Sequence, residues 1–395
     1  MVNPTYEKLG SAPSMIRELF AYGLRRSAEV GPEHVYDYSL GNPSIPAPQP
    51  VQQALLDVLH DTDPIQVHGY SMAGGFDGTR RAVAEDLTHR FGMTIRPEEL
   101  FFTCGAAAAL ISVIRALTVS PDSEFVAIAP YFPEYRVFIE GVKGKIKVIP
   151  PEPEHFQIDF SAFEQAVTCR TKGVIINSPN NPSGVVYSRQ TLETLAAILR
   201  AKEALYGHPI YLISDEPYRE LAYDGVEVPY LTKYYDNTVV GYSYSKSLSL
   251  PGERIGYLVI PDELKDSEEV LSAANVATRI LGFVNAPTLQ QKVVEKCLNE
   301  KTDLSFYDRN REDLYNGLKE CGFECIKPQG AFYLFVKSPV PNEKEFCEAA
   351  KKYNILIVPG SSFACPGYVR LAYCVSHETI VNSLPKFKEL AKEYF

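Results

Sequence analysis

Short apolar runs alternate with amphipathic stretches through the first two thirds of the chain. Four of these runs are rich in β-branched or aromatic side chains and are bounded by Pro, Gly, Asn or Asp, which predicts buried strands over residues 125–129, 174–177, 211–214 and 239–243. Between the second and third runs, Ser188 suits a helix N-cap, and apolar residues recur at helical spacing as far as residue 206. Strands separated by helices predict crossover units in a mainly parallel sheet.

The pattern changes in the last third of the chain. The predicted order is a long polar helical stretch, a strand, a helix, two short apolar runs and a final helix, at residues 286–321, 331–336, 343–353, 355–358, 368–372 and from 378 to the end. This mixture of elements predicts a smaller α+β unit. Four prolines between residues 43 and 50 predict a stiff connection ahead of the larger unit.

Charge and composition narrow the classes of function. Among 395 residues, 49 are acidic and 39 basic, for a formal net charge of −10. This argues against a nucleic-acid or anionic-membrane surface, because both require an excess of basic residues. No apolar run is long enough to span a membrane, and the polar N-terminal residues do not resemble a signal peptide. The eight cysteines lack zinc-site spacing, so we expect reduced thiols, no bound metal and a cytoplasmic protein.

The ends of the predicted strands carry the residues with candidate chemistry. The motifs S-P-N-N-P-S-G (178–184), D-E-P-Y (215–218) and Y-S-K-S (244–247) each follow a predicted strand, and Arg254 comes shortly after the third motif. Upstream, T-C-G-A-A-A (103–108) opens an alanine-rich helical pattern. Each motif alone is ordinary loop or helix-cap sequence. In parallel sheets, however, ligands bind at the carboxyl ends of the strands, so we expect the motifs to lie close together.

In this order and spacing, the motifs resemble the class I/II aminotransferases, the fold type I group of enzymes that depend on pyridoxal 5′-phosphate (PLP). The resemblance extends from S-L-G-N-P (39–43) to Y-V-R-L (368–371). It implies an α/β fold, with a three-layer αβα large domain around a mainly parallel sheet at residues 46–285. A smaller α+β domain would combine residues 1–45 with 286–395. The resemblance also implies a homodimer that moves an amino group between an L-amino acid and a 2-oxo acid.

The resemblance assigns five residues to the ring of the cofactor. Lys246 matches the lysine that forms the Schiff base (internal aldimine) with PLP, and a crowded, cationic pocket lowers the pKa of such an amine. Asp215 matches the carboxylate that keeps the pyridine nitrogen protonated, so that the ring accepts electrons from the substrate carbanion. Asn181 and Tyr218 match the residues that hydrogen-bond the phenolic oxygen. Phe132 matches the aromatic residue stacked on the ring, where the family often has Trp and this chain has none.

The phosphate and the substrate involve a second group of residues. A helix start with small residues presents free N–H groups and the positive end of the helix dipole to a phosphate. By resemblance, the phosphate ligands are Gly105, Ala106, Ala107, Ser243, Arg254 and, less well matched, Ser245, with Tyr70 reaching the phosphate of the neighbouring subunit. Arg370 matches the arginine that binds the substrate α-carboxylate through a bidentate fork. Asn181 also borders the substrate, and Gly41 leaves room where a Cβ would crowd it.

The residues that would bind the substrate side chain stay open. Arg17, Arg136 and Arg279 lie at candidate positions for binding a second carboxylate, and His68 lies near Tyr70, but the sequence around each lacks a family motif. Glu253, in P-G-E-R-I-G, is a faint sign of acidic substrates.

The reaction class also has alternatives. The same lysine, aspartate and arginine would serve a PLP lyase, either a carbon–sulfur β-lyase or an aminocyclopropane-carboxylate-synthase-like enzyme, because the pocket decides the fate of the carbanion. Release of ammonia or pyruvate without an oxo-acid acceptor distinguishes a lyase. A regulatory protein that uses this fold as an effector sensor would carry an N-terminal DNA-binding module. The landmarks begin near residue 40, so we do not expect such a module.

Overall fold

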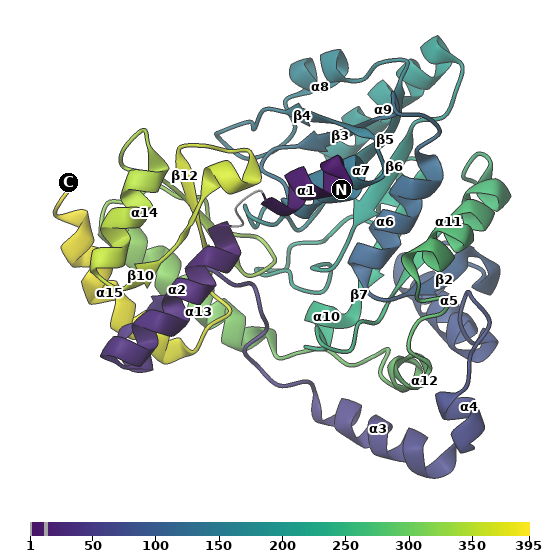
Figure 1. Cartoon of the computed structure of the whole chain (residues 1–395), viewed down its shortest axis with the longest axis horizontal. Helices are drawn as coiled ribbons and strands as arrows, with labels where there is room; N and C mark the ends of the chain where they lie inside the picture. Colours follow the sequence, from purple (N-terminus) through teal and green to yellow (C-terminus); the bar gives the residue numbers. More distant parts are fainter. Residues whose placement is uncertain (1, 12–14) are drawn as a thin grey trace.

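A seven-stranded sheet forms the centre of the larger part of the molecule (Figure 1). The computed structural model describes residues 2–11 and 15–395. The strands are β2 (Leu100–Thr103), β3 (Glu124–Ile128), β4 (Lys145–Ile149), β5 (Thr171–Asn177), β6 (Tyr211–Asp215), β7 (Thr238–Ser243) and β8 (Gly256–Val259). Their order is β2-β8-β7-β6-β5-β3-β4, and β8 alone runs in the opposite direction to the other strands.

Helices cover both faces of this sheet. The helices of this part of the molecule are α3 (Gln49–Asp61), α4 (Pro64–His68), α5 (Asp77–Phe91), α6 (Ala106–Leu117), α7 (Glu134–Gly141), α8 (Phe160–Ala166), α9 (Arg189–Tyr206), α10 (Tyr244–Ser247), α11 (Ser267–Leu281) and α12 (Thr288–Lys296). Because side chains alternate along a strand, Ile175 and Ile213 pack with residues of α6, α7 and α11. Val174 and Leu212 pack with residues of α8 and α9. We call the sheet and these helices the large lobe.

A second part, the small lobe, is built from segments near both ends of the chain. Its helices are α2 (Met15–Val30), α13 (Leu304–Glu320), α14 (Glu343–Lys352) and α15 (His377–Ala391), and its strands are β1 (Tyr36–Asp37), β9 (Tyr333–Lys337), β10 (Ile355–Leu356), β11 (Val358–Pro359) and β12 (Tyr368–Ala372). The parallel pair β1-β10 joins the two chain segments, beside the antiparallel sheet β11-β12-β9. No helix in the described part of either lobe is long and apolar enough to cross a membrane.

The predicted α/β class is confirmed, because a mainly parallel sheet lies between two helical layers. Helix α9 begins after Ser188, whose hydroxyl oxygen accepts a hydrogen bond from the Thr191 N–H at 3.0 Å, as an N-cap should. Strands β2, β4 and β8 were not predicted. β2 and β8 have only four residues each, and β4 lies at the sheet edge, where Lys145 and Val148 are exposed. The reversed direction of β8 was missed too, because periodicity carries no information on strand direction.

The polar stretch at 286–321 is two helices rather than one. Helix α13 starts after the N-cap Asp303, whose carboxylate accepts a hydrogen bond from the Ser305 N–H at 2.9 Å. Helix α12 contacts α3, α4 and α5 and therefore packs in the large lobe. In the same way, the apolar run at 355–358 is divided between β10 and β11, which belong to different sheets. We propose that the large domain, expected to end at residue 285, extends through α12. Helix α1 (Pro4–Ser11) also contacts α7 of the large lobe.

The antiparallel strand β8 explains how distant motifs meet. Its first residue, Gly256, pairs with Thr103 at the end of β2 and with Ser243 at the end of β7. The loop before β8 therefore lies at the same sheet edge as the segments that follow β2 and β7. A Cβ at Gly256 would lie only 3.0 Å from the Gly105 Cα. The close approach of these two backbones requires glycine at residue 256.

Candidate active site

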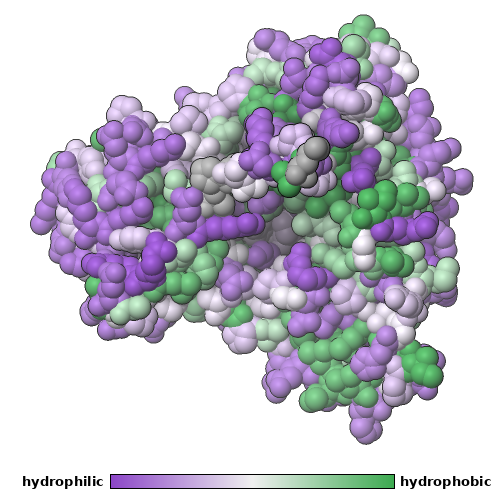
Figure 2. Space-filling view, viewed as in Figure 1, coloured by the Kyte–Doolittle hydropathy of each residue, from purple (hydrophilic) through white to green (hydrophobic). Residues whose placement is uncertain are grey.

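The predicted motifs come together at the carboxyl ends of β5, β6 and β7. The surface of the molecule is hollowed between the two lobes (Figure 2). Asp215 at the end of β6 pairs in register with Asn177 and with Gly241. Asn177 links two of the turns. Its Nδ2 donates to the Asp215 carbonyl oxygen at 2.9 Å, and its Oδ1 accepts from the Asn181 N–H at 2.8 Å. The motifs after β5 and β6 thus meet as the sheet topology predicted.

Asp215 is a buried carboxylate with one oxygen left free. Tyr135, on α7, donates its hydroxyl to Oδ2 at 2.5 Å, whereas Oδ1 has no partner among the described residues. Burial raises the pKa of Asp215 to about 7, although the hydrogen bond from Tyr135 lowers it, and the charge of Glu216 raises it further. A buried acceptor without a donor is costly. Oδ1 is therefore suited to a donor that a ligand supplies.

Lys246 lies in the one-turn helix α10, directly after β7. Its Nζ donates to the Gly41 carbonyl oxygen at 2.8 Å and lies 5.3 Å from the centre of the Phe332 ring. Burial lowers the pKa of Lys246 to about 8, and the charges of Arg254 and Arg370 lower it as well. With such a pKa, about a tenth of the amine is neutral at pH 7. A neutral amine is the form that attacks a carbonyl.

A pair of tyrosines joins the two lobes beside this lysine. Tyr218 belongs to the turn after β6, and Tyr333 belongs to β9 of the small lobe. Their hydroxyl oxygens lie 2.9 Å apart, and both side chains are buried. A Cβ at Gly41 would lie 1.9 Å from the Tyr333 hydroxyl oxygen. Any side chain at residue 41 would therefore collide with Tyr333, and the sequence did not reveal this constraint.

Arg370, on β12, is a buried guanidinium without a carboxylate partner among the described residues. Its carbon Cζ lies 4.7 Å from the ring centre of Tyr333 and 4.8 Å from that of Phe363. Nη1 donates to Asn181 Oδ1 at 3.2 Å, Nη2 donates to the Ser39 carbonyl oxygen, and Nε has no partner in the described part of the chain. Burial lowers the pKa of Arg370. The site therefore holds a cation whose counter-charge is not supplied by the described chain.

The residues predicted to bind a phosphate gather around the start of β8. Gly105 is the N-cap of α6 and has a φ of 83°. A Cβ there would lie 2.9 Å from Arg254 Nη2. The Arg254 guanidinium donates to two backbone carbonyls and remains solvent-exposed. The hydroxyl oxygens of Ser243 and Ser245 lie 2.7 Å apart. A glycine, a helix start, two hydroxyls and a guanidinium are a donor set that suits a phosphate.

Two further predicted residues lie at different depths. Phe132 is partly buried, and its ring meets that of Tyr135 edge-on with 5.7 Å between the ring centres. Tyr135 also binds Asp215, so Phe132 packs against the tyrosine that holds this carboxylate. Tyr70, in the loop after α4, is 90% exposed, and its side chain forms no hydrogen bond with the described residues.

The residues considered for recognising the substrate side chain lie outside these contacts. All five have exposed side chains: Arg17, Arg136, Arg279, His68 and Glu253. Arg136 pairs with Glu140 at 2.7 Å, and Glu253 accepts a hydrogen bond from Gln290. Within the described chain, none of the five bonds to the side chains around Lys246 or Arg370.

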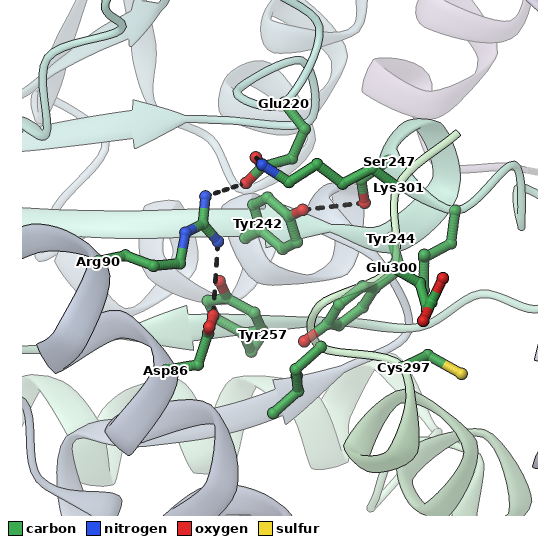
Figure 3. A pocket seen from close by; sticks show the side chains of 12 residues that line it. Asp86, Arg90, Glu220, Tyr242, Tyr244, Ser247, Tyr257, Cys297, Glu300 and Lys301 are labelled. Atoms are coloured by element: carbon green, nitrogen blue, oxygen red, sulfur yellow. Dashed lines mark hydrogen bonds and ion pairs between the residues drawn. The ribbon is translucent and has the colours of Figure 1, made fainter. Parts of the chain in front are cut away.

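A small polar pocket borders α10 and the turn after β6 (Figure 3). In it, Glu220 pairs with Arg90 and, at 3.4 Å, with Lys301. Tyr242 donates its hydroxyl to Ser247 Oγ at 2.9 Å. These contacts support the helix of the lysine and the turn of the aspartate from outside the predicted site. The sequence analysis singled out none of them.

Sequence reasoning also missed three side chains that complete the site. Tyr135, in P-Y-F-P-E-Y, and Tyr333, in A-F-Y-L-F, look like ordinary core aromatics in the sequence. Asn177 is different, because a polar residue that ends a buried apolar strand is unusual and marks the carboxyl edge of the sheet. That signal was available in the sequence.

Comparison with known proteins agrees with this geometry. The family profile described as aminotransferase class I and II matches residues 34–385. The chain belongs to this family. Among curated relatives, the aspartate/prephenate aminotransferase of Thermus thermophilus is 31% identical over 360 residues, which cover 88% of each chain. The probable aspartate/prephenate aminotransferase of Thermus aquaticus is 32% identical over 333 residues, which cover 81% of this chain and 83% of the relative.

Solved structures show the same fold for this aminotransferase. A crystal structure of an aminotransferase from Eubacterium rectale is 50% identical, with a TM-score of 0.98, and the match covers 100% of this chain and 99% of that one. Aspartate aminotransferase from Thermus thermophilus with maleate is 27% identical, with a TM-score of 0.86, over 99% of this chain and 100% of that one. The fold is that of the fold type I PLP enzymes, as the resemblance implied.

Members of this family depend on PLP, and the residues of this aminotransferase fit the cofactor. The unpartnered Oδ1 of Asp215 suits a protonated pyridine nitrogen. The space that a Cβ at Gly105 would fill, beside Arg254, suits a phosphate. Lys246 has the lowered pKa that an amine needs to attach to an aldehyde.

Proposed function

We propose that this aminotransferase moves an amino group between an L-amino acid and a 2-oxo acid by means of PLP attached to Lys246. The observation that carries the proposal is the buried Oδ1 of Asp215, which lacks a donor among the described residues. A protonated ring nitrogen is the donor that satisfies this oxygen. The same contact keeps the ring electron-poor.

The other proposed contacts with the cofactor follow from the same arrangement. When bound, PLP supplies an electron sink for the carbanion at the substrate Cα. Asn181 and Tyr218 would hold the phenolic oxygen, and Phe132 would cover a face of the ring. The phosphate would be bound by Gly105, Ala106, Ala107, Ser243, Ser245 and Arg254. These groups hold and orient the cofactor, and Lys246 does the proton chemistry.

Lys246 acts first as a nucleophile and then as a base. A pKa of about 8 leaves enough neutral amine for attachment at physiological pH. As a base, the free amine of Lys246 would take the proton from the substrate Cα and would return it to the C4′ carbon of the cofactor. The Gly41 carbonyl, 2.8 Å from Nζ, accepts a hydrogen bond that holds the amine in place.

Arg370 provides the contact that selects amino acids. Its buried guanidinium has no carboxylate partner in the described chain, so the substrate α-carboxylate is its proposed counter-ion. Asn181, whose Oδ1 accepts from Arg370 Nη1 at 3.2 Å, fixes the orientation of the guanidinium. The α-carboxylate at Arg370 and the amino group near Lys246 leave the Cα proton accessible to the lysine.

We also propose a cytoplasmic homodimer in which Tyr70 reaches the phosphate bound by the partner subunit. The support is exposure, because Tyr70 is 90% exposed beside Met72 and Ile65, which are 75% and 80% exposed. A dissociation measurement by analytical ultracentrifugation tests the dimer. Tyr70→Phe should weaken PLP binding, because it removes the hydroxyl that would contact the phosphate and leaves the ring in place. An unchanged affinity would remove Tyr70 from the phosphate site.

A donor and acceptor screen tests the proposed reaction. Because two curated relatives are named for aspartate and prephenate, aspartate is the first donor to test, followed by the other L-amino acids. The cofactor spectrum is followed in single turnover, and 2-oxo acids are then added as acceptors. Conversion of the cofactor by the donor, reversed by an oxo acid, supports the proposal. Ammonia release without an acceptor would instead identify a lyase.

Lys246→Ala serves as the control for this screen. It should still bind PLP, because the phosphate and ring contacts remain. Borohydride should then no longer fix the cofactor to the protein, and turnover should stop. A variant that is still fixed by borohydride would show that a different lysine carries the cofactor.

A further inference from the structure

Tyr333 contacts several groups that the proposed function uses, although its position in the sequence suggests a core residue. Its hydroxyl lies 2.9 Å from that of Tyr218, and its ring lies under the guanidinium of Arg370, 4.7 Å from Cζ. The same hydroxyl fills the space that Gly41 leaves open, and the carbonyl of Gly41 accepts the hydrogen bond from Lys246. Tyr333 comes from the small lobe, whereas Tyr218 and Lys246 come from the large lobe.

We propose that Tyr333 is a positioning residue with two separable parts. Its hydroxyl directs the hydroxyl of Tyr218 toward the phenolic oxygen of the cofactor, and its ring holds Arg370 ready for the substrate carboxylate. This inference rests on the proposed function. It adds to that function a residue that touches neither the reacting atoms nor the substrate.

The hydroxyl part follows from counting donors. Tyr218 has one proton, and if it donates that proton to the cofactor, its own oxygen is left as an acceptor. Tyr333 supplies the matching donor at 2.9 Å. A hydroxyl that accepts one hydrogen bond becomes a stronger donor in the next. The titratable groups that face this pair are Asp215, Tyr135, Cys374 and Arg370.

The ring part follows from strand register. In the antiparallel pair, Tyr333 on β9 lies opposite Ala372 on β12. Arg370, two residues earlier on β12, therefore points to the same face of the sheet. The ring of Phe363 also contacts the guanidinium, with its centre 4.8 Å from Cζ, so two aromatic rings pack against the cation. In a buried setting, such contacts restrict the guanidinium without neutralising its charge.

Tyr333→Phe tests the hydroxyl alone, because the ring remains. The readout is the pH titration of the absorbance of the cofactor attached to Lys246. A weaker donor at Tyr218 stabilises the phenolate form less, so protonation at the lysine linkage becomes easier. The titration midpoint should rise by about half a unit to one unit. Affinity for an unreactive 2-methyl amino acid should stay within about twofold of the wild type, because the ring still holds Arg370.

Two leucine variants test the ring. Tyr333→Leu and Phe363→Leu should each weaken binding of the 2-methyl amino acid about tenfold. Only Tyr333→Leu should also raise the titration midpoint. Tyr218→Phe is the positive control for that shift and should move the midpoint at least as far as Tyr333→Phe.

The outcomes separate this inference from the proposed function. If Tyr333→Phe titrates like the wild type while Tyr218→Phe shifts, the hydroxyl part is wrong. If Phe363→Leu shifts the midpoint as far as Tyr333→Phe, the effect is general loosening of the site, and the inference is overturned. A wild-type protein that neither binds PLP nor transfers amino groups would refute the proposed function instead.

Discussion

Two arginines are buried to a similar degree and surrounded very differently. Arg219, in the turn after β6, donates from Nε to Glu216 at 2.5 Å, and its other two nitrogens donate to backbone carbonyls at 3.0 and 3.2 Å. Arg370 has an unpartnered Nε and no carboxylate among the described residues. Burial acts to lower the pKa of both. For Arg219, burial is the largest single influence, but the charge of Glu216, its hydrogen bond and the charges of Tyr230 and Glu220 together outweigh burial and raise the pKa. The pKa of Arg370 stays lowered.

The difference distinguishes a structural charge from the charge that we propose binds the substrate. A buried ion pair whose two members are both in the chain is complete before any ligand arrives. A buried guanidinium without a partner remains an uncompensated charge until a carboxylate binds. The two arginines are 6% and 2% exposed, so burial alone does not distinguish their roles. The two roles are distinguished by the hydrogen-bond and ion-pair partners that the chain supplies to each arginine.

The largest expected effect is on the complete pair. Arg219→Met leaves the carboxylate of Glu216 buried and uncompensated, which should lower the free energy of unfolding by about 3–5 kcal/mol in denaturant titrations. The double variant Glu216→Gln with Arg219→Met removes both charges and should recover most of that loss. If the double variant is no more stable than the single one, the pair is not the source of the stability.

Arg370→Met should give the opposite pattern. Amino-acid affinity should fall by about 30- to 1000-fold, because the proposed charged partner of the α-carboxylate is lost. The free energy of unfolding should stay the same or rise, since an uncompensated buried charge is removed. Saturation kinetics and denaturant titration of the same sample provide both readouts. A loss of stability like that of Arg219→Met would mean that Arg370 has an unrecognised internal partner.

Gly105→Ala should act mainly on the cofactor. Its φ of 83° strains any residue with a Cβ, and the new methyl group would lie 2.9 Å from Arg254 Nη2. PLP affinity, measured by equilibrium dialysis, should fall about tenfold, equivalent to about 1–2 kcal/mol of strain and displacement. Gly207→Ala is the matched control, with a φ of 73° but open space around the new Cβ. It should cost stability only, and an equal loss of PLP affinity there would contradict this account.

The smallest expected effect is a change in pH dependence. Attachment of PLP to the cofactor-free protein requires neutral Lys246, so the rate should rise about tenfold per pH unit up to pH 8 and then level off. The charge of Arg370 contributes to the lowered pKa of Lys246. In Arg370→Met the pKa should be higher, and the plateau should therefore begin at a higher pH. A wild-type rate that keeps rising to pH 10 would show an ordinary, solvated lysine.

The fold was predictable where local pattern and topology agree. Helix α9, with its Ser188 cap, and the strands β5, β6 and β7 follow from apolar runs and their boundaries. Strand β8 was not predictable, because its place between β2 and β7 and its reversed direction depend on pairing with residues far away in the sequence. The break between α12 and α13 was missed because polar helical periodicity runs across it.

The site was predictable as a set of motifs but not as a set of contacts. Lys246, Asp215 and Arg370 lie in motifs whose order resembles the family. Tyr333 and Tyr135 lie in aromatic stretches, and what distinguishes them is one hydroxyl partner each, Tyr218 and Asp215. Such partners come from other strands and helices. A single sequence therefore shows which residue types are present without showing which of them remain unsatisfied.

Lys246 and Arg370 are attached to separate sheets, and this separation has a mechanical consequence. The lysine follows β7 of the seven-stranded sheet, and the arginine belongs to β12 of the three-stranded sheet, and these sheets share no strand. An α-amino acid that engages both residues is therefore a cross-link between two independently hydrogen-bonded frameworks. Occupied protein should exchange the amide hydrogens along the seam between the lobes more slowly than empty protein. A single bound amino acid would reversibly connect the two lobes.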